Sequence, residues 1–259
     1  ILEIKNLKTH YQTEKGVVKA NDGISLSIDE NEVVGLAGES GCGKSTLIRT
    51  LIRLVPKSAH VSADKMQFKG QDILTMSDKD FREKILWQGI GLVPQSAMNA
   101  LNPVYRVGDQ CIEAIQAHTD YDKAECEQIV KRLFDAVGLQ AGMMKAYPHE
   151  FSGGMRQRSM IAMSLVLNPD LVIMDEPTTG LDVLVQERIL RNIKEIRKKS
   201  ESSVSILLIT HDISVIAEMS DRIGIMYAGR LMEFAESMEL FNEPFHPYTL
   251  GLKNAFPSI

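Results

Sequence analysis

The sequence predicts an α/β fold built on a mostly parallel sheet. Four short apolar runs have the composition of strands buried on both faces, and they lie at residues 33–37, 90–93, 171–174 and 205–209. Between them, apolar residues recur at helical spacing, as in 129–137 and 185–196. Strands that alternate with helices are typical of a parallel sheet covered by helices.

The remaining elements modify this plan. At the start, 2–7 and the alternating run 24–28 predict strands of a small antiparallel sheet with one buried face. A helix is expected over 45–55, where Pro56 stops it. The stretch 96–166 contains helical patterns and no convincing strand, which indicates a helical subdomain inserted in the sheet. Near the end, 222–235 predicts a hairpin that turns at Ala228-Gly229.

Composition limits what the chain can do. Hydrophobic residues make up 44% of its 259 residues and charged residues 24%, which is ordinary for a globular protein. The net charge of -5 gives no electrostatic reason to expect nucleic-acid binding. Cys42, Cys111 and Cys126 form no CxxC pair, which argues against a disulfide scaffold or zinc site and for a reducing compartment. No apolar run approaches the ~18–20 residues needed to span a bilayer, so any membrane role requires a partner.

A glycine-rich octet follows the strand at 33–37. Gly38-Glu39-Ser40-Gly41-Cys42-Gly43-Lys44-Ser45 fits G-x-x-x-x-G-K-[ST], a phosphate-binding loop between a strand and a helix. Glycines let backbone N–H groups curl around phosphate oxygens, and the helix start adds the positive end of its dipole. Lys44 can reach the β- and γ-phosphates, and the Ser45 hydroxyl can ligate Mg²⁺. The expected ATP-binding residues here are Gly38, Ser40, Gly41, Cys42, Gly43, Lys44, Ser45 and Thr46, with no chemistry assigned to the Cys42 thiol.

Two acids end the apolar strand at 171–174. A buried strand delivers Asp175 to the carboxyl edge of the sheet, where α/β ligand sites lie, and there it can hold Mg²⁺ through water. Glu176 is the natural base to polarise an attacking water. Simple exposure of two acids to solvent explains the same pattern equally well, but the phosphate loop favours the functional interpretation.

A third motif indicates a family. Phe151-Ser152-Gly153-Gly154-Met155-Arg156-Gln157-Arg158 resembles the LSGGQ signature of ABC ATPases, although Phe151 and Met155 depart from it. Ser-Gly-Gly before a helix offers a second anion cradle. In that family Ser152, Gly153 and Gly154 would act on ATP bound by the opposite subunit.

The resemblance implies roles for four further residues. Gln95 is placed like the Q-loop glutamine that contacts Mg²⁺ and the attacking water, and Asp182 ends a D-loop-like Thr179-Gly180-Leu181-Asp182. His211 resembles the switch histidine at the γ-phosphate, and Tyr11 the aromatic residue that stacks on adenine. A structural role for His211, and packing within the small sheet for Tyr11, are the alternatives. The implied catalytic set is Glu176, His211 and Gln95, and the implied metal set is Ser45, Gln95 and Asp175.

A narrower resemblance involves three segments. Residues 99–104, 151–158 and 243–249 are similar to the oligopeptide/dipeptide/nickel importer subfamily, which includes oligosaccharide importers. Many members carry a cysteine-rich C-terminal extension, some with an iron–sulfur site. This sequence stops at Ile259 without those cysteines, so we expect no cluster in this chain.

Taken together, the resemblance implies a P-loop NTPase core with a small antiparallel β subdomain and an inserted helical subdomain, all in one domain over 1–259. The expected function is ATP hydrolysis that powers an importer of peptides, oligosaccharides or nickel. The expected partners are a second ATPase subunit in a head-to-tail dimer, identical or paralogous, two transmembrane permease subunits and, indirectly, an extracytoplasmic solute-binding protein. The expected location is the cytoplasmic face of the membrane.

Two other classes fit less well. A DNA-repair or translation ATPase of the same family would have a long coiled coil between its motifs, or two cassettes in one chain. A switch that binds ATP without hydrolysing it would not need Glu176 and His211.

Overall fold

The structure is a computed structural model that describes residues 1–95, 100–177 and 204–255. The chain forms two compact units. The first unit comprises Ile1–Phe81 and Ser205–Ile259, and the second comprises Arg82–Val204. The predicted helix over 185–196 lies outside the described residues.

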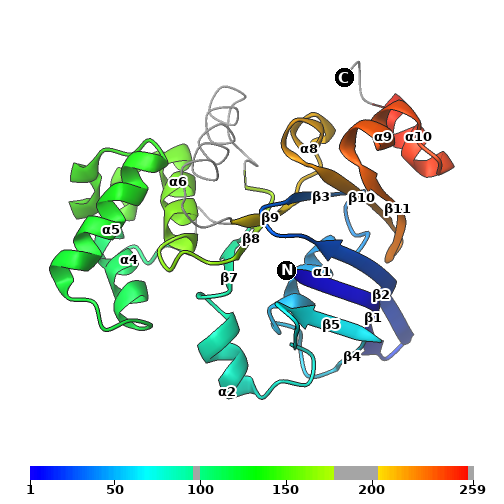
Figure 1. Cartoon of the computed structure of the whole chain (residues 1–259), viewed down its shortest axis with the longest axis horizontal. Helices are drawn as coiled ribbons and strands as arrows, with labels where there is room; N and C mark the ends of the chain where they lie inside the picture. The colour runs from blue at the N-terminus through cyan, green and yellow to red at the C-terminus, as the bar shows by residue number, and fades with distance from the viewer. Residues whose placement is uncertain (96–99, 178–203, 256–259) are drawn as a thin grey trace. The chain divides into compact units, whose positions relative to one another are not determined.

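An antiparallel sheet occupies the N-terminal part of the first unit (Figure 1). Its strand order is β2-β1-β5-β6, with β4 also paired to β1. The strands are β1 (Leu2–Thr13), β2 (Gly16–Ile28), β4 (Ala59–Ser62), β5 (Lys65–Phe68) and β6 (Gln71–Asp72). Both predicted N-terminal strands are thus present but longer than predicted. Their extra residues form the exposed end of a hairpin, which carries little apolar alternation.

Parallel strands form the other sheet of the first unit. The order is β11-β10-β3-β9, in which β3 (Val33–Ala37) pairs in parallel with both β9 (Ser205–Ile209) and β10 (Arg222–Tyr227). Every residue of β3 and β9 is buried, as their apolar composition predicts. β11 (Arg230–Glu236) pairs antiparallel with β10, and the predicted hairpin at Ala228-Gly229 is confirmed.

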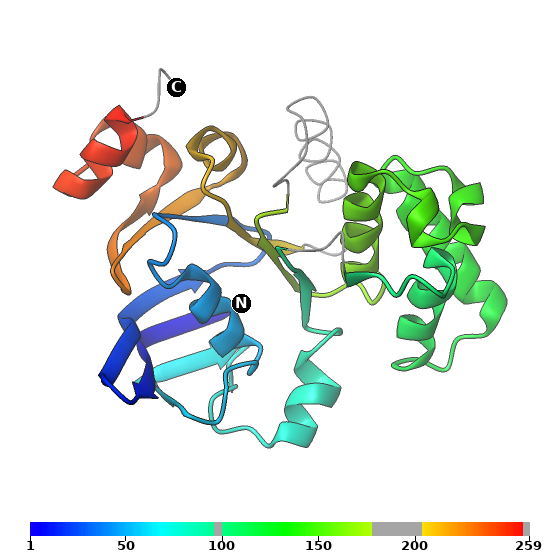
Figure 2. The same ribbon diagram turned by 180° about the vertical axis from the view of Figure 1, so that it is seen from behind.

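Short helices surround these strands. They are α1 (Lys44–Leu51), α2 (Asp78–Asp80), α8 (Ile213–Met219), α9 (Ser237–Asn242) and α10 (Pro247–Asn254). α1 packs against β1 and β2, as the view from behind shows (Figure 2). It ends earlier than the predicted 45–55 because Arg53 takes a left-handed φ of 55°, from which its guanidinium donates to the carbonyls of Ile73 and Met76.

The second unit combines two strands with packed helices. β7 (Ile90–Val93) and β8 (Leu171–Asp175) pair in parallel. α4 (Val107–Gln116), α5 (Lys123–Ala136) and α6 (Gly153–Ser164) pack against one another (Figure 1), and η2 (Ala141–Lys145) and η3 (Pro148–Glu150) are 3-10 turns. A π-helical turn, η1 (Phe81–Ile85), begins at Phe81, the residue that directly precedes the second unit.

Trp87 lies between η1 and β7 in the second unit. Its backbone takes a left-handed φ of 70°, and its N–H donates to the Ile90 carbonyl over 3.0 Å. The indole ring lies 6.1 Å from the His118 ring, centroid to centroid, and is 37% exposed. The side chain is therefore held at the surface of this unit against one neighbouring ring.

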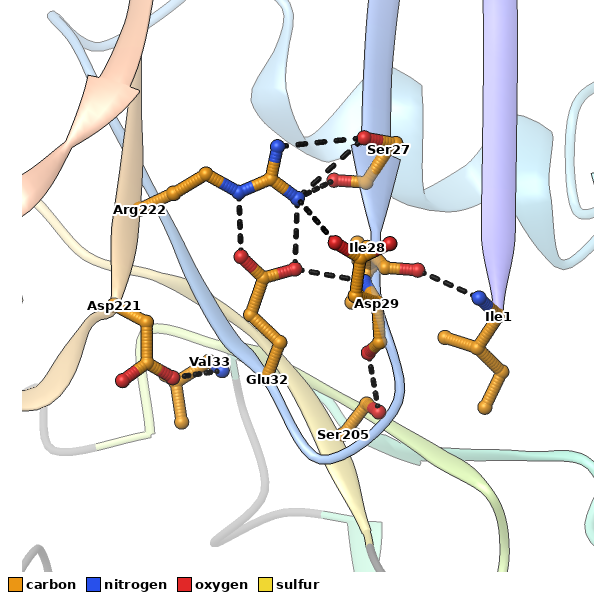
Figure 3. A network of polar contacts seen from close by, with 9 residues as sticks. All are labelled: Ile1, Ser27, Ile28, Asp29, Glu32, Val33, Ser205, Asp221 and Arg222. Carbon is orange, nitrogen blue, oxygen red and sulfur yellow. Dashed lines mark hydrogen bonds and ion pairs between the residues drawn. The ribbon is translucent and has the colours of Figure 1, made fainter.

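A polar network joins the amino ends of the parallel strands in the first unit (Figure 3). Arg222 donates to both carboxylate oxygens of Glu32, over 2.5 and 2.8 Å, and to the Ser27 carbonyl over 3.1 Å. Although burial of Glu32 favours its neutral form, the Arg222 guanidinium and the Asp29 N–H hold the pKa of Glu32 below its usual value. The network holds the amino ends of these strands together. The loops that follow their carboxyl ends lie at the opposite edge of the sheet, where α/β ligand sites lie.

None of the helices in the described ranges combines the length and the hydropathy needed to cross a bilayer.

Candidate functional site

The phosphate loop joins β3 to α1 and fits tightly against its neighbours. Gly38 has a φ of 147°, and a Cβ atom there would lie 2.2 Å from the Met226 carbonyl oxygen. Gly43 has a φ of 108°, and a Cβ atom there would lie 2.3 Å from the Ala20 carbonyl oxygen. Both conformations favour glycine and both contacts exclude any side chain. The first and last glycines of the motif are therefore required by the backbone path of the loop.

Lys44 lies within the curve of this loop. Its side chain is buried, and its ammonium donates to the carbonyls of Gly38 over 2.6 Å and of Glu39 over 2.9 Å. α1 begins at Lys44, and no side chain of the described residues caps its start. A buried ammonium and the backbone N–H groups of a helix start are therefore directed at one place, which suits a phosphate group.

Two neighbouring segments hold the loop in shape. From β2, the Asn21 side chain donates to the Gly43 carbonyl over 3.1 Å. From the β10–β11 turn, the Gly229 N–H donates to the Cys42 carbonyl over 2.9 Å, and the Gly229 carbonyl accepts from the Asp22 N–H over 2.8 Å. These contacts join residues far apart in the chain, so the sequence motif gave no sign of them.

Tyr11 lies near the end of β1, on the side that faces α1. Thr9, two residues earlier, places its hydroxyl 2.9 Å from that of Thr50 in α1, and alternation puts Tyr11 on the same face. Val18 is paired directly opposite Tyr11 and is 52% exposed. A half-buried tyrosine beside an exposed valine forms an apolar surface suited to a flat base. Val18 is not among the residues that the sequence predicted for the site, although an apolar residue in a polar hairpin is a signal that could have identified it.

His211 follows β9 at the sheet edge that carries the phosphate loop. β9 and β3 run parallel with Ile209 beside Leu36, so the loops that follow them leave from the same edge. His211 is exposed, and Asp212, next in the chain, caps α8 by accepting from the N–H groups of Ser214 and Val215.

In the second unit, the structure brings Gln95 and Glu176 together. Asp175 is the last residue of β8, and Gln95 follows the neighbouring strand β7. The Gln95 amide donates to Glu176 Oε2 over 2.9 Å. Glu176 has a left-handed φ of 48°, an uncommon conformation for a residue with a side chain, and such outliers cluster at active sites. A carboxylate held at a strand end by an amide donor can orient a water molecule.

The Ser-Gly-Gly segment opens α6 in the same unit. Ser152 is the N-cap residue, and its hydroxyl oxygen accepts from the Met155 N–H over 3.3 Å. Because a hydroxyl has one donor hydrogen besides its acceptor sites, Ser152 can still donate to an anion. The start of α6 therefore has the character expected of a second phosphate-binding element. Asp182 lies outside the described residues, as do Thr179, Gly180 and Leu181.

Two side chains of the phosphate loop and of β8 have the oxygen atoms that a magnesium ion prefers. The described residues contain no group of three or more His, Cys, Asp or Glu side chains that can hold one. Mg²⁺ commonly binds through one or two protein ligands, the phosphates of the substrate and water. The Ser45 hydroxyl next to Lys44 in the first unit and the Asp175 carboxylate in the second have the oxygen chemistry that Mg²⁺ prefers.

These features define a P-loop NTPase, in which a phosphate loop follows a central parallel strand and a carboxylate follows another. The family model described as "ABC transporter" matches residues 21–179, so the chain belongs to the ABC transporter family. It is an ATPase that uses ATP and Mg²⁺.

Curated proteins that resemble the chain over its full length include two peptide-transport proteins. The dipeptide transport ATP-binding protein DppD of Bacillus subtilis (strain 168) is 41% identical over 262 residues, which cover 100% of this chain and 77% of that protein. The oligopeptide transport ATP-binding protein OppD of Escherichia coli (strain K12) is 40% identical over 261 residues, which cover 100% and 76%.

Among solved structures, cbiO1 of Clostridium perfringens, part of the ABC transporter complex cbiONQ, superposes with a TM-score of 0.80. It is 28% identical, and the match covers 94% of this chain and 91% of that one. The predicted fold class is confirmed: a P-loop core with a mostly parallel sheet, an antiparallel β subdomain and a helical subdomain.

Proposed function

We propose that this ATPase powers a peptide importer from the cytoplasmic face of the membrane. The observation that carries the proposal is the similarity to DppD and OppD, which are named as dipeptide and oligopeptide transport proteins and are 41% and 40% identical to this chain over its full length. We further propose that 1–259 is one nucleotide-binding domain and that 96–166 is its helical subdomain. The helices α4, α5 and α6 support this division.

The first unit binds the nucleotide. Tyr11 stacks on the adenine, with Val18 beside it. The backbone N–H groups of Gly38 to Thr46 surround the phosphates, where Lys44 moves from the Gly38 and Glu39 carbonyls to the β- and γ-phosphates. Ser45, Asp175 and Gln95 are the residues that would hold Mg²⁺, and the ion would offset the negative charge of the phosphate oxygens.

Hydrolysis takes place at Glu176. Its carboxylate polarises a water molecule whose oxygen attacks the γ-phosphorus, and the bond to the ADP oxygen breaks to release phosphate. Gln95 keeps Glu176 in place through the 2.9 Å contact. His211, at the edge that follows β9, contacts the γ-phosphate.

Each ATP-binding site is completed by residues of a second ATPase subunit. The start of α6, with Ser152, Gly153 and Gly154, contacts the nucleotide bound by the partner, and Asp182 lies at the same interface. The partner is a second copy or a paralogue. Closure of the dimer on ATP moves two permease subunits between access states, and hydrolysis reopens it. An extracytoplasmic binding protein delivers the solute.

The experiment is phosphate release by the complete transporter in liposomes, with its binding protein loaded in turn with short peptides, an oligosaccharide or nickel ion. We expect stimulation by peptides alone. Stimulation by the oligosaccharide or nickel alone contradicts the peptide assignment, and hydrolysis indifferent to every loaded binding protein contradicts the importer assignment.

A further inference from the structure

The segment that leads into α10 is fixed to β11. Glu233 of β11 accepts from the Phe245 N–H over 2.9 Å and from the His246 N–H over 3.1 Å. His246 is the N-cap residue of α10, where its Nδ1 accepts from the Tyr248 N–H over 3.1 Å. Although burial of Glu233 favours the neutral acid, the nearby Thr249 hydroxyl and these N–H groups hold the pKa of Glu233 below its usual value. The first turn of α10 therefore has a defined position relative to the sheet.

In this position Tyr248 packs against two parts of the first unit that adjoin the phosphate loop, the end of β10 and the buried cluster beside the end of β3. The Tyr248 ring lies 4.7 Å from the ring of Tyr227, centroid to centroid, at an angle of 45°. Tyr227 is the last residue of β10, two residues before Gly229, whose N–H bonds the loop at Cys42. Tyr248 also packs against the buried cluster that contains Ala37, the residue directly before Gly38.

The Tyr248 hydroxyl lies in the interior of the first unit. Its oxygen is buried and has no hydrogen-bond partner among the described residues. Burial raises the pKa of the phenol, and so does the Glu39 carboxylate, whereas the Glu39 N–H has the opposite effect. Glu39 is the second residue of the phosphate loop, so the phenol lies within electrostatic range of the loop, while the ring packs against Tyr227 and the cluster that contains Ala37.

The phosphate loop is packed so closely against the end of β10 that a shift of this strand would displace the loop. The Met226 carbonyl, one residue before Tyr227, would lie 2.2 Å from a Cβ atom on Gly38, so strand β10 and the first glycine are already in close contact. A displacement of the end of β10 would therefore move both the Gly38 contact and the Gly229 hydrogen bond. The N–H groups that surround the phosphates depend on the same backbone.

We propose that Tyr248 is a positioning residue for the phosphates of ATP. Its ring packs against Tyr227 and the cluster that contains Ala37, and in this way it keeps the phosphate loop in the conformation that binds ATP. The proposal rests on the proposed nucleotide site of the first unit. It assigns to Tyr248 a role in ATP affinity, separate from any role of its segment in contacting other subunits.

The test compares three variants of the full chain, assembled with its partner ATPase and permeases. Tyr248→Ala removes the ring, and we expect the KM for Mg-ATP to rise about threefold to tenfold, the size of an aromatic pair, with a smaller change in kcat. Tyr248→Phe keeps the ring and should stay within about twofold of the unchanged protein. Phe245→Ala is the matched control, because it alters a side chain in the same segment that is 77% exposed.

Binding of Mg-ATP to each isolated variant is measured by calorimetry, well below its own unfolding temperature, so that lost stability is not read as lost affinity. If Tyr248→Ala does not fold, Tyr227→Ala removes the other ring of the pair and carries the same expectation. Unchanged KM and affinity in the folded alanine variant overturn the proposal, as does an equal loss in Phe245→Ala.

Lys44→Ala separates this proposal from the nucleotide site on which it rests. If Lys44→Ala loses ATP binding while Tyr248→Ala keeps it, the positioning role of Tyr248 is wrong and the assignment of the nucleotide site is retained. If Lys44→Ala also binds ATP normally, the site itself is wrong.

Discussion

Glu176 combines two properties that bear on its role, a left-handed backbone and an amide donor on its carboxylate. Glu176→Gln keeps the size of the side chain and an oxygen that can accept from Gln95, but it removes the charge that polarises water. We expect Mg-ATP to bind normally while hydrolysis falls by about 10²–10⁴-fold, as on loss of a general base. Phosphate release under saturating Mg-ATP measures the effect.

In the proposed mechanism the dimer reopens only after hydrolysis, so the same variant should accumulate as an ATP-bound dimer. Size-exclusion chromatography with light scattering, with and without Mg-ATP, detects it, and the partner ATPase is included as a matched sample. Hydrolysis at the unaltered rate would remove Glu176 as the base, and His211 would be the next residue to change.

Tyr11 offers a second test of a single side chain. Tyr11→Ala should weaken ATP binding by roughly 1–3 kcal/mol, the contribution of base–aromatic stacking, with little change in kcat. Tyr11→Phe should bind as the unchanged protein does, because the ring face does the stacking. Calorimetric titration with Mg-ATP compares the two, and equal losses would show that the hydroxyl has another task.

At the scale of elements, the phosphate loop depends on two glycines for different reasons. Gly43→Ala adds a Cβ atom 2.3 Å from the Ala20 carbonyl oxygen at a φ of 108°, whereas Gly41→Ala adds one at a φ of 80° with no atom within 4 Å. Both variants carry backbone strain, but only the first collides with β2. We expect ATP affinity to fall about tenfold further in Gly43→Ala than in Gly41→Ala.

Titration of both variants with Mg-ATP gives the comparison, and circular dichroism confirms that each is folded. Equal affinities would mean that the contact between the loop and β2 does not shape the site.

The elements that the sequence predicted well are those whose signal is local. β3 and β9 are buried on both faces, and their sequences are therefore apolar runs. The spacing of the glycines and Lys44 predicted the phosphate loop. The hairpin between β1 and β2 was underestimated because its exposed end lacks alternation, and α1 was predicted too long because the left-handed turn at Arg53 has no sequence signal.

Contacts between distant parts of the chain were beyond sequence reasoning. The bond from Gly229 to Cys42 and the packing of Tyr248 on Tyr227 follow from how the strands are ordered, and neither residue pair has a spacing that a motif records. The approach of Gln95 to Glu176 was implied only by the family resemblance, and it follows physically from the parallel pairing of β7 with β8.

At the scale of the whole molecule, acid should remove part of the folding stability. The pKa of Glu32 is lower in the folded state than its ordinary value of 4.5, so its contribution is complete above that value and is lost as pH falls through the folded-state pKa. Glu32→Gln should therefore lower the free energy of unfolding by about 1.5–3 kcal/mol at neutral pH, the range for a hydrogen bond to a charged group.

Urea unfolding of both proteins at a series of pH values checks this. The difference between them should be constant from neutral pH to about 5 and should shrink below 4.5. A constant difference down to the lowest pH would mean that the charge of Glu32 contributes nothing and that the side chain acts through packing alone.

The position of Trp87 has a consequence for spectroscopy. It is the only tryptophan in the sequence, and it lies in the second unit, whereas the phosphate loop lies in the first. With the His118 ring 6.1 Å away, its emission depends on the local geometry of the two rings. A change in intrinsic fluorescence on adding Mg-ATP would therefore be an optical record of the second unit responding to the nucleotide, obtained without attaching a dye.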